Sequence, residues 1–493
     1  MSRLALRMFL ATALALLPAS LPAQIAQSEY AARRDSLAAR LGDAVIVVLG
    51  AHEPAEDFLS FFQSSAFLYL TGLREPEAAL VMVHRGGQLS SILFVQPKDP
   101  GREVWTGHRL GAAGVAGLTG MQGRSTDELG GVLDSLARTG LPFSVIGELG
   151  GSEGATPDGQ FVQRLRARNP SLTLAAGAAL AERILRGSKS PAELRLIRRA
   201  VDITVAAQHD AMRAIKTARN EFEIQALIEY DFRRSGADRP SFATIIASGP
   251  NSTTLHYNAD DRFFSPGDVM VMDIGAQYNG YAADVTRTVP ISGTFSPEQR
   301  DVYQLVRNAQ AAAERQATLG APARAMSDSA NAVLAEGLAR LGLIEAPSAT
   351  FEGAPGQCPA PAGCPQLSLY YMHGLGHGIG LDVHDPDQFY FTGKIASGSA
   401  FTIEPGIYVR ANVLETLADT PRNRATVAKL SAAVRKYANI GIRIEDDYIA
   451  TAAGVEWISR APREMAEIEA AMREPWAGLG AGNTAPVRVR HDQ

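Results

Sequence analysis

The sequence predicts a protein of mixed α/β (α+β) structure with two domains, of which the N-terminal one is the smaller. Its 493 residues exceed the length of one ordinary domain. Short runs of β-branched residues recur in the first part of the chain, which is typical of buried strands. Near residue 190 the pattern changes to long amphipathic helices that alternate with strand-like segments. We therefore expect the domain boundary at about residues 175–190.

The composition excludes several classes of protein. Hydrophobic residues make up 46% of the chain and charged residues 20%, which is normal for a globular protein and excludes global disorder. The formal net charge is −5, whereas a nucleic-acid-binding protein usually carries a basic excess. No apolar run reaches the ~20 residues that a membrane-spanning helix needs. We therefore expect no nucleic-acid partner and no stable membrane span.

The first 23 residues resemble a secretory signal. Arg3 and Arg7 precede an apolar run that ends at Pro18, and small residues follow. We expect residues 1–23 to be removed and the mature chain to be exported, either to a periplasm or out of the cell; a later cleavage and a buried N-terminal helix are the alternatives. Two cysteines lie in a loop rich in Pro and Gly, Cys358 and Cys364. Export permits a disulfide between them, which we favour over two free thiols.

The two domains are expected over residues 28–175 and 188–465, with a C-terminal tail at 466–493. In the first domain, apolar runs at residues 45–49, 79–83 and 92–95 predict strands. In the second domain, helices are expected over residues 190–215, 221–235, 296–320 and 325–341. Capping boxes begin the first and third of these helices, and Gly320 and Gly342 are placed to end the last two.

The most informative segment of the second domain is residues 269–289. An Asn-Gly pair at 279–280 separates two apolar runs and predicts a hairpin with a two-residue type I′ turn. In that register Asp273 faces Thr286, so Asp273 and Asp284 lie diagonally on one face. Two carboxylates on an apolar hairpin need a shared proton, a cationic partner or a metal ion. We favour the metal ion; ordinary surface acids on an exposed hairpin are the alternative.

Further candidate ligands follow along the chain. Three histidines fall in a glycine-rich segment: His373, His377 and His384. Glycines let a ligand approach the backbone closely, and here they argue against a helical zinc motif. Glu404 ends an apolar strand, and Glu445 shares with Arg443 the polar face of a strand with period-two alternation. A structural role is the alternative for each of these residues taken alone.

Together these residues predict a dinuclear metal site. Four carboxylates carry about four negative charges, which two divalent cations balance, with a hydroxide bridging the ions. Oxygen-rich ligation with one imidazole suits Mn, Co, Fe or Zn better than a thiolate-type zinc site. The carboxylates are those of Asp273, Asp284, Glu404 and Glu445.

The order of these motifs resembles the pita-bread metallopeptidase family, and most of all its Xaa-Pro aminopeptidases. Segments 67–79 and 105–111 are similar to the N-terminal domain that these enzymes share with prolidases. The catalytic motifs are matched by segments 255–257, 273–288, 373–385, 402–408 and 441–446. The resemblance implies a pita-bread catalytic domain after a smaller α/β domain. It also implies an enzyme that hydrolyses the N-terminal Xaa-Pro bond of peptides with a metal-bridging hydroxide, and the signal-like start of the chain adds the expectation that this enzyme is exported.

Carried over to this sequence, the resemblance implies a role for each matched residue. The ligands of two divalent ions, with Mn favoured over Co, Zn or Fe, would be Asp273, Asp284, His377, Glu404 and Glu445. The residues matching the family's substrate-facing histidines are His256, His373 and His384, and those matching its accompanying residues are Arg443 and Tyr408. Glu404 would also move a proton, and His384 would stabilise the developing oxyanion. The resemblance further implies a homo-oligomer and peptide substrates with proline at the second position.

Other interpretations remain open from the sequence. The motifs do not separate an Xaa-Pro aminopeptidase from a prolidase, which cleaves dipeptides only; a creatinase-like hydrolase and a metal-free binding protein of the same fold are more distant alternatives. The chain departs from the family pattern in a Pro-rich insertion at residues 346–367 and in a long link between Tyr408 and Ile440, where a surface helix is expected at 420–437. Either departure could border the substrate cleft.

Overall fold

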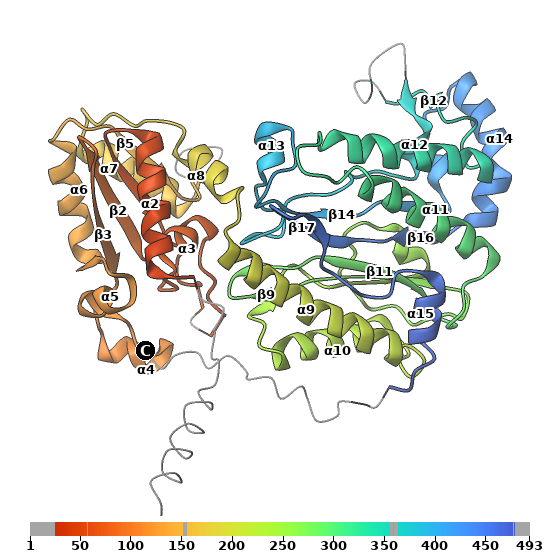
Figure 1. Ribbon diagram of the computed structural model, residues 1–493, viewed down its shortest axis with the longest axis horizontal. Helices are drawn as coiled ribbons and strands as arrows, with labels where there is room; N and C mark the ends of the chain where they lie inside the picture. Colours follow the sequence, from red (N-terminus) through yellow and green to blue (C-terminus); the bar gives the residue numbers. More distant parts are fainter. Residues whose placement is uncertain are drawn as a thin grey trace, which may run out of the picture.

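The computed structural model describes residues 25–56, 58–150, 155–354, 358, 363–476 and 478. Within them the chain forms two units, which meet at the turn between α8 (Ala178–Arg186) and α9 (Pro191–Ala214) (Figure 1). The expected secretory signal lies outside the described residues. None of the described helices combines the length and the apolar character that a membrane crossing requires.

A five-stranded sheet forms the centre of the N-terminal unit. Its strand order is β4-β3-β2-β1-β5, with β1 antiparallel to β2 and parallel to β5. The strands are β1 (Ala44–Leu49), β2 (Ala79–Arg85), β3 (Gln88–Val95), β4 (Gln122–Ser125) and β5 (Phe143–Ile146). The helices are α2 (Gln27–Leu41), α3 (Ser65–Thr71), α4 (Pro100–Thr106), α5 (Gly111–Thr119), α6 (Leu129–Ala137), α7 (Pro157–Arg168) and α8. The three apolar runs of the sequence therefore form β1, β2 and β3, as predicted.

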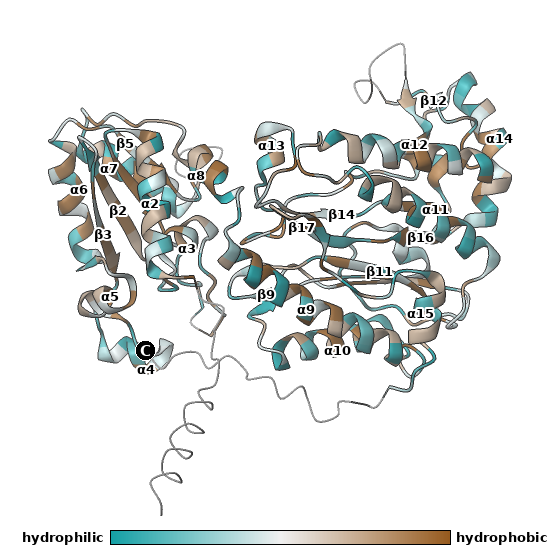
Figure 2. Ribbon diagram, viewed as in Figure 1, coloured by the Kyte–Doolittle hydropathy of each residue, from teal (hydrophilic) through white to brown (hydrophobic). Residues whose placement is uncertain are grey.

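Helices cover the strands of the C-terminal unit from two sides. Figure 1 shows α9 and α10 (Glu221–Arg234) on one side, and α11 (Pro297–Glu314) and α12 (Arg324–Leu341) on the other. In Figure 2 these helices carry both hydrophobic and hydrophilic residues, and buried hydrophobic residues of all four contribute to the main core of the unit. Capping boxes begin α9 and α11 as predicted. However, α11 is shorter than expected: it ends at Glu314, and Gly320, six residues further on, donates its backbone N–H to Ile395 at 2.8 Å and does not cap the helix.

The strands of this unit form small sheets with the orders β11-β8-β7, β10-β9-β6, β14-β17-β18 and β15-β16. They are β6 (Arg239–Pro240), β7 (Ile245–Ser248), β8 (Val269–Ile274), β9 (Ala276–Tyr278), β10 (Tyr281–Ala282), β11 (Val285–Pro290), β14 (Ala400–Ile403), β15 (Gly406–Val409), β16 (Ile440–Arg443), β17 (Asp446–Thr451) and β18 (Gly454–Trp457). Glu445, between β16 and β17, donates its backbone N–H to Thr286 of β11 at 3.1 Å. This hydrogen bond places the acidic end of β16 beside the hairpin β8–β11.

The predicted insertion forms a short hairpin that carries a disulfide. The strands of the hairpin are β12 (Thr350–Phe351) and β13 (Cys364–Pro365). Later in the chain come the short α13 (Gln388–Thr392) and the expected surface helix, α14 (Pro421–Tyr437). A disulfide joins Cys358 to Cys364, as we favoured. Asn423 of α14 exchanges two hydrogen bonds of 2.9 Å with the backbone of Glu352. Figure 1 places β12 and α14 together at the end of the C-terminal unit that is remote from the N-terminal unit.

The expected tail starts later than residue 466. Residues Met465–Ala471 form α15, whose Ile468 and the following Met472 are fully buried in the main core of the C-terminal unit. Glu469 accepts a hydrogen bond from the backbone N–H of Phe295 at 3.2 Å. Because α15 is packed into the core, the C-terminal unit extends past residue 465, and the short apolar pattern there does not reveal this burial in the sequence.

Candidate metal centre and active site

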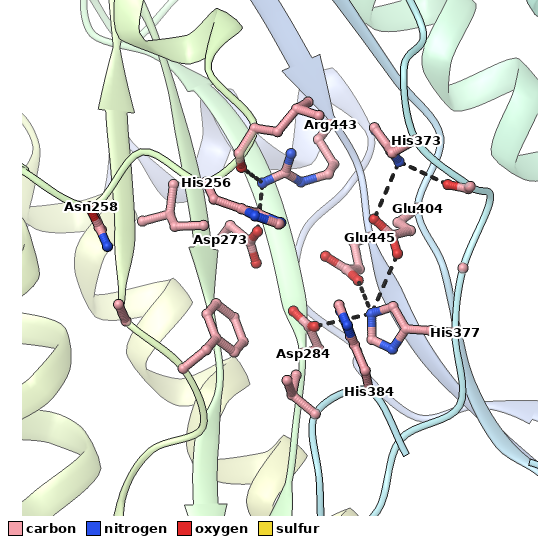
Figure 3. Close-up of a pocket in the computed structure, with 17 residues that line it drawn as sticks. His256, Asn258, Asp273, Asp284, His373, His377, His384, Glu404, Arg443 and Glu445 are labelled. Atoms are coloured by element: carbon pink, nitrogen blue, oxygen red, sulfur yellow. Dashed lines mark hydrogen bonds and ion pairs between the residues drawn. The ribbon is translucent and has the colours of Figure 1, made fainter. Parts of the chain in front are cut away.

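The hairpin β8–β11 has the predicted register. Thr286 is the partner of Asp273, and the same register continues to the turn. At the turn, Asn279 and Gly280 have φ values of 53° and 87°, as a type I′ turn requires. Asp273 and Asp284 therefore lie on one face, and both line the cavity drawn in Figure 3.

His377 reaches the same cavity because its segment runs along β14. Thr402 of β14 donates its backbone N–H to the carbonyl oxygen of His377 at 2.8 Å, and the His377 N–H donates to Thr402 Oγ1 at 3.1 Å. Gly376 makes this approach feasible, because a Cβ atom at that position would lie 2.1 Å from the Thr402 carbonyl oxygen. The glycines of this segment thus bring a histidine against a strand.

Three carboxylates surround the imidazole of His377. Its Nε2 lies 3.4 Å from Asp284 Oδ2, 3.4 Å from Glu404 Oε1 and 3.9 Å from Glu445 Oε1 (Figure 3). Ligand atoms of Asp284, His377 and Glu445 lie within 4.8 Å of one another. The structure therefore brings together, from four separate segments, side chains that the sequence places as ligands.

Asp273 has a cationic partner within the protein. Its Oδ2 accepts a hydrogen bond from Arg443 Nη2 at 2.5 Å, and Arg443 Nη1 donates to the Tyr408 hydroxyl at 2.8 Å. Thr286 links this pair to another carboxylate, since it donates to Glu445 Oε2 at 2.7 Å and accepts from Arg443 Nε at 3.3 Å. Arg443 shares a strand face with Glu445 in the sequence, but its ion pair is made with Asp273 of the hairpin. Thr286 was missed, although its position opposite Asp273 is a signal that could have found it.

His373 occupies the end of the same chain of hydrogen bonds. Its Nε2 lies 2.8 Å from the Tyr408 hydroxyl and its Nδ1 lies 2.8 Å from the carbonyl oxygen of Gly374. Burial, with a smaller contribution from Arg443, lowers the pKa of His373 to about 4, so the ring is neutral at pH 7. A neutral ring that accepts from Tyr408 and donates to Gly374 has no nitrogen free for a substrate. The substrate-facing role of His373 stays a prediction, and this arrangement does not favour it.

The electrostatics of the cluster favour a bound cation. Burial and the neighbouring Glu445 raise the pKa of Asp284 well above its usual range, and burial and Glu404 do the same for Glu445. Burial raises the pKa of Glu404 to about 8. Burial lowers the pKa of His377 to about 4, which keeps its imidazole neutral and available as a ligand.

The buried oxygen atoms provide a direct test of whether a metal fits. Asp273 Oδ1, Asp284 Oδ1 and Glu445 Oε1 are buried, and no hydrogen-bond donor reaches them within the described residues. Such atoms are costly in a protein interior unless a cation or a donor satisfies them. Oxygen donors with one imidazole match the preferences of hard and borderline divalent metals. The residues present therefore fit divalent metal ions.

The remaining expected residues line the same cavity, which has a volume of about 460 Å³. The His384 ring lies 4.1 Å from the His377 ring, measured between centroids, and His256 enters from the opposite wall (Figure 3). Sequence reasoning missed the apolar part of the lining, which comprises Phe242, Ile245, Leu255 and Val383. No described residue of the insertion at 346–367 or of the link after Tyr408 belongs to the lining.

Comparison with known proteins agrees with this geometry. Residues 195–452 match the model of metallopeptidase family M24, and residues 30–141 match that of the aminopeptidase P N-terminal domain. The chain belongs to the Xaa-Pro aminopeptidases of family M24. It is 33% identical to the Xaa-Pro aminopeptidase of Haemophilus influenzae over 413 residues, which cover 83% of this chain and 88% of that protein. The "Xaa-Pro aminopeptidase 1" of Streptomyces coelicolor is 31% identical over 470 residues, which cover 90% and 87% of the two chains.

Solved structures of this family share the fold. The structure of Pseudomonas aeruginosa aminopeptidase PepP superposes with a TM-score of 0.74 and 31% identity, covering 92% of this chain and 99% of that one. Aminopeptidase P from E. coli gives a TM-score of 0.74 and 28% identity, covering 91% and 98%. The pita-bread fold and the smaller α/β domain before it are thereby confirmed. As a member of this family the chain is a metallo-exopeptidase, and the cluster around His377 is its candidate metal site.

Proposed function

We propose that this M24 member removes the first residue from peptides with proline at the second position, at a centre of two divalent metal ions. The proposed ligands are Asp273, Asp284, His377, Glu404 and Glu445. The observation that supports the proposal is the convergence of three carboxylates on the neutral imidazole of His377, with a fourth, Asp273, beside them in an ion pair with Arg443. The named relatives are Xaa-Pro aminopeptidases, which favours this activity over that of a prolidase.

The charges of the cluster support a pair of ions. Four ionised carboxylates and the Arg443 guanidinium leave three net negative charges in a buried space. Two divalent cations and one hydroxide would balance that charge, and such a pair supplies a nucleophile at neutral pH. A single divalent cation would leave an excess of negative charge, which is costly to bury. We favour Mn, with Co, Zn and Fe as the alternatives.

The side chains around the ligands have distinct tasks in this proposal. Glu404 Oε1 faces His377 while Oε2 faces His373 at 3.7 Å, so one oxygen can bind metal while the other carries a proton. His384 would donate a hydrogen bond to the carbonyl oxygen as negative charge develops on it. An Xaa-Pro bond is a tertiary amide without N–H. The apolar wall formed by Phe242, Ile245 and Leu255 suits a proline ring, which offers no donor there.

A comparison of substrates tests the activity. The metal-loaded protein is incubated with an Xaa-Pro dipeptide and with an Xaa-Pro-Xaa tripeptide, and the released first residue is quantified. We expect the tripeptide to be cleaved; cleavage of the dipeptide alone would identify a prolidase. Glu404→Gln should abolish turnover without changing the circular dichroism spectrum, and near-normal activity of that variant would refute the assigned role.

A metal analysis tests the centre itself. We expect about two equivalents of a transition metal per chain after loading with Mn²⁺, measured by mass spectrometry of the metal content. One equivalent would refute the dinuclear proposal. A protein without any such metal that stays inactive after addition of Mn²⁺ or Co²⁺ would instead be a binding protein with this fold.

We also propose export and self-association. The two arginines and the apolar run at the start of the chain support removal of a signal, and the disulfide between Cys358 and Cys364 suits an oxidising compartment. Sequencing the N-terminus of the protein recovered from its native compartment tests the first proposal, and an intact Met1 would contradict it. Light scattering after gel filtration tests the expected homo-oligomer.

A further inference from the structure

The turn between α8 and α9 lies against the segment that carries His384. Gly187 in this turn accepts a hydrogen bond from the backbone N–H of Gln388 at 3.1 Å, and Lys189 donates its backbone N–H to Gly398 at 2.8 Å. A Cβ atom at Gly187 would lie 3.2 Å from the carbonyl carbon of Asp387. The connection between the two units is therefore packed directly on the backbone that follows His384.

Asp385, the residue after His384, makes ion pairs with two cations of this turn and helix. Its Oδ1 lies 2.7 Å from Arg186 Nη1, and its Oδ2 lies 2.8 Å from Lys189 Nζ. The Asp385 side chain is fully buried, and the two cationic side chains are nearly so. Lys189 also donates to the carbonyl oxygen of Pro386. A buried charge cluster of this kind is weak evidence for stability, so its geometry points to a role in placing the segment.

Asp382, on the other side of His384, shares the same arginine. Its Oδ2 lies 2.6 Å from Arg186 Nη1, and its Oδ1 accepts a hydrogen bond from Ser65 Oγ, at the start of α3, at 2.5 Å. Arg186 is held in turn by Glu182 at 3.0 Å. Both residues that bracket the Val383–His384 pair are thus fixed by one guanidinium, and the N-terminal unit contributes to this through Ser65.

The His384 ring makes few contacts of its own. It lies 4.1 Å from the His377 ring, measured between centroids, and it makes no hydrogen bond in the described part of the chain. The backbone of this segment closes on itself where Asp385 donates its N–H to Gly378 at 2.7 Å. The direction of the exposed His384 ring is therefore set by the position of its backbone. That position is fixed by the hydrogen bond and the ion pairs of Asp385.

We propose that Arg186 and Lys189, at the junction of the two units, are positioning residues that aim His384 at the substrate through Asp385. This inference rests on the proposed function, because it assigns the effect to the role of His384 at the developing oxyanion. Neither cation lines the cavity of the metal centre, so neither is a candidate for contact with the reacting atoms. The junction between the units would then serve catalysis as well as assembly.

Steady-state kinetics of a double-mutant cycle test the inference. Lys189→Met keeps the aliphatic stem and removes the charge, and we expect kcat for an Xaa-Pro-Xaa tripeptide to fall tenfold or more while KM changes less than threefold. In the His384→Ala background, the same substitution should change kcat less than twofold, since the group that it positions is gone. Arg183→Ala, on the exposed side of α8, is the matched control and should leave kcat within twofold.

Two further measurements keep the outcomes distinct. Metal content of Lys189→Met should equal that of the wild type; a loss of metal in proportion to kcat would show an effect through His377 and would overturn the inference. Should Lys189→Met fail to fold, Asp382→Asn, at a half-exposed position, is expected to lower kcat two- to fivefold through the same arginine. Equal effects of Lys189→Met with and without His384 would also overturn the inference. An inactive wild-type protein would instead refute the proposed function.

Discussion

Arg443 Nη2 lies 2.5 Å from Asp273 Oδ2, so one of the five expected metal ligands already has a cationic partner from the protein. Arg443 is 4% exposed, and its guanidinium also donates to the Tyr408 hydroxyl. Removing one partner of a buried pair is costly because the other charge stays buried and unpaired. If Arg443 were removed, a metal ion bound to Asp273 would still neutralise part of the negative charge of that carboxylate. The stability cost of removing Arg443 should therefore depend on metal.

Arg443→Met should destabilise the metal-free protein more than the metal-loaded one. We expect a loss of about 3–5 kcal/mol in the free energy of unfolding without metal, and a clearly smaller loss with saturating Mn²⁺. Urea titrations followed by circular dichroism measure both values. The control is Arg198→Met, which breaks an exposed pair with Glu456 and should cost at most about 1 kcal/mol in either state. Equal losses for Arg443→Met in both states would contradict the assignment of Asp273 as a ligand.

The stability of the metal-free protein should fall as the pH rises. The pKa values of Asp284, Glu404 and Glu445 are raised in the folded protein, that of Glu404 to about 8, so the folded state binds protons that the unfolded state releases near pH 4–5. Their stabilisation is complete below the unfolded pKa and is lost as the pH rises through the folded pKa.

We therefore expect the melting temperature of the metal-free protein to decrease between about pH 6 and pH 9. Saturating Mn²⁺ should flatten the profile, because a bound cation favours the ionised carboxylates. Differential scanning calorimetry across this range measures both profiles. Glu404→Gln, which has no titrating group at that position, should show a shallower slope without metal. A melting temperature that rises with pH in the metal-free protein would contradict the raised pKa values of these buried carboxylates.

Much of the fold and the site was readable from local sequence signals. The Asn-Gly turn fixes the register of the hairpin, and the side-chain period of two then places Asp273 and Asp284 on one face. Capping boxes likewise fix where α9 and α11 begin. These predictions succeeded because each depends on a few neighbouring residues and on geometry that the rest of the fold does not alter.

The failures concern contacts between distant segments. Arg443 and Glu445 share a strand face in the sequence, yet Arg443 pairs with Asp273, because the direction of a long side chain is set by the partner that the fold supplies. The pairing of Asp385 with Arg186 and Lys189 joins segments about 200 residues apart in sequence, and no local sequence pattern predicts it. The helix α11 ends at Glu314, and Gly320, which was expected to cap it, makes a hydrogen bond to the distant Ile395 instead.

Two glycines shortly before His377 offer a matched pair of substitutions. A Cβ atom at Gly376 would lie 2.1 Å from the Thr402 carbonyl oxygen, whereas a Cβ atom at Gly374 meets nothing within 4 Å. We expect Gly376→Ala to separate the His377 segment from β14, to cost about 1–3 kcal/mol in the free energy of unfolding and to weaken Mn²⁺ binding. Gly374→Ala should stay within about 0.5 kcal/mol of the wild type. Calorimetric titration with Mn²⁺ checks the affinity, and unchanged affinity for Gly376→Ala would argue against His377 as a ligand.

The helix α15 should be required for the stability of the C-terminal unit. Ile468 and Met472 are fully buried in the core, and Arg213 forms an ion pair of 2.6 Å with Glu474 beyond the helix. Ile468→Ala should cost about 2–5 kcal/mol in the free energy of unfolding, because it removes a fully buried side chain and leaves a cavity. A chain ending at residue 464 should aggregate or melt well below the wild type, since the surface that α15 covers would be exposed. A chain ending at residue 478 should have the same melting temperature as the wild type. Thermal unfolding of the two shortened chains and the wild type distinguishes these outcomes. A wild-type melting temperature for the shorter chain would show that the catalytic unit ends where the sequence alone suggested, before residue 466.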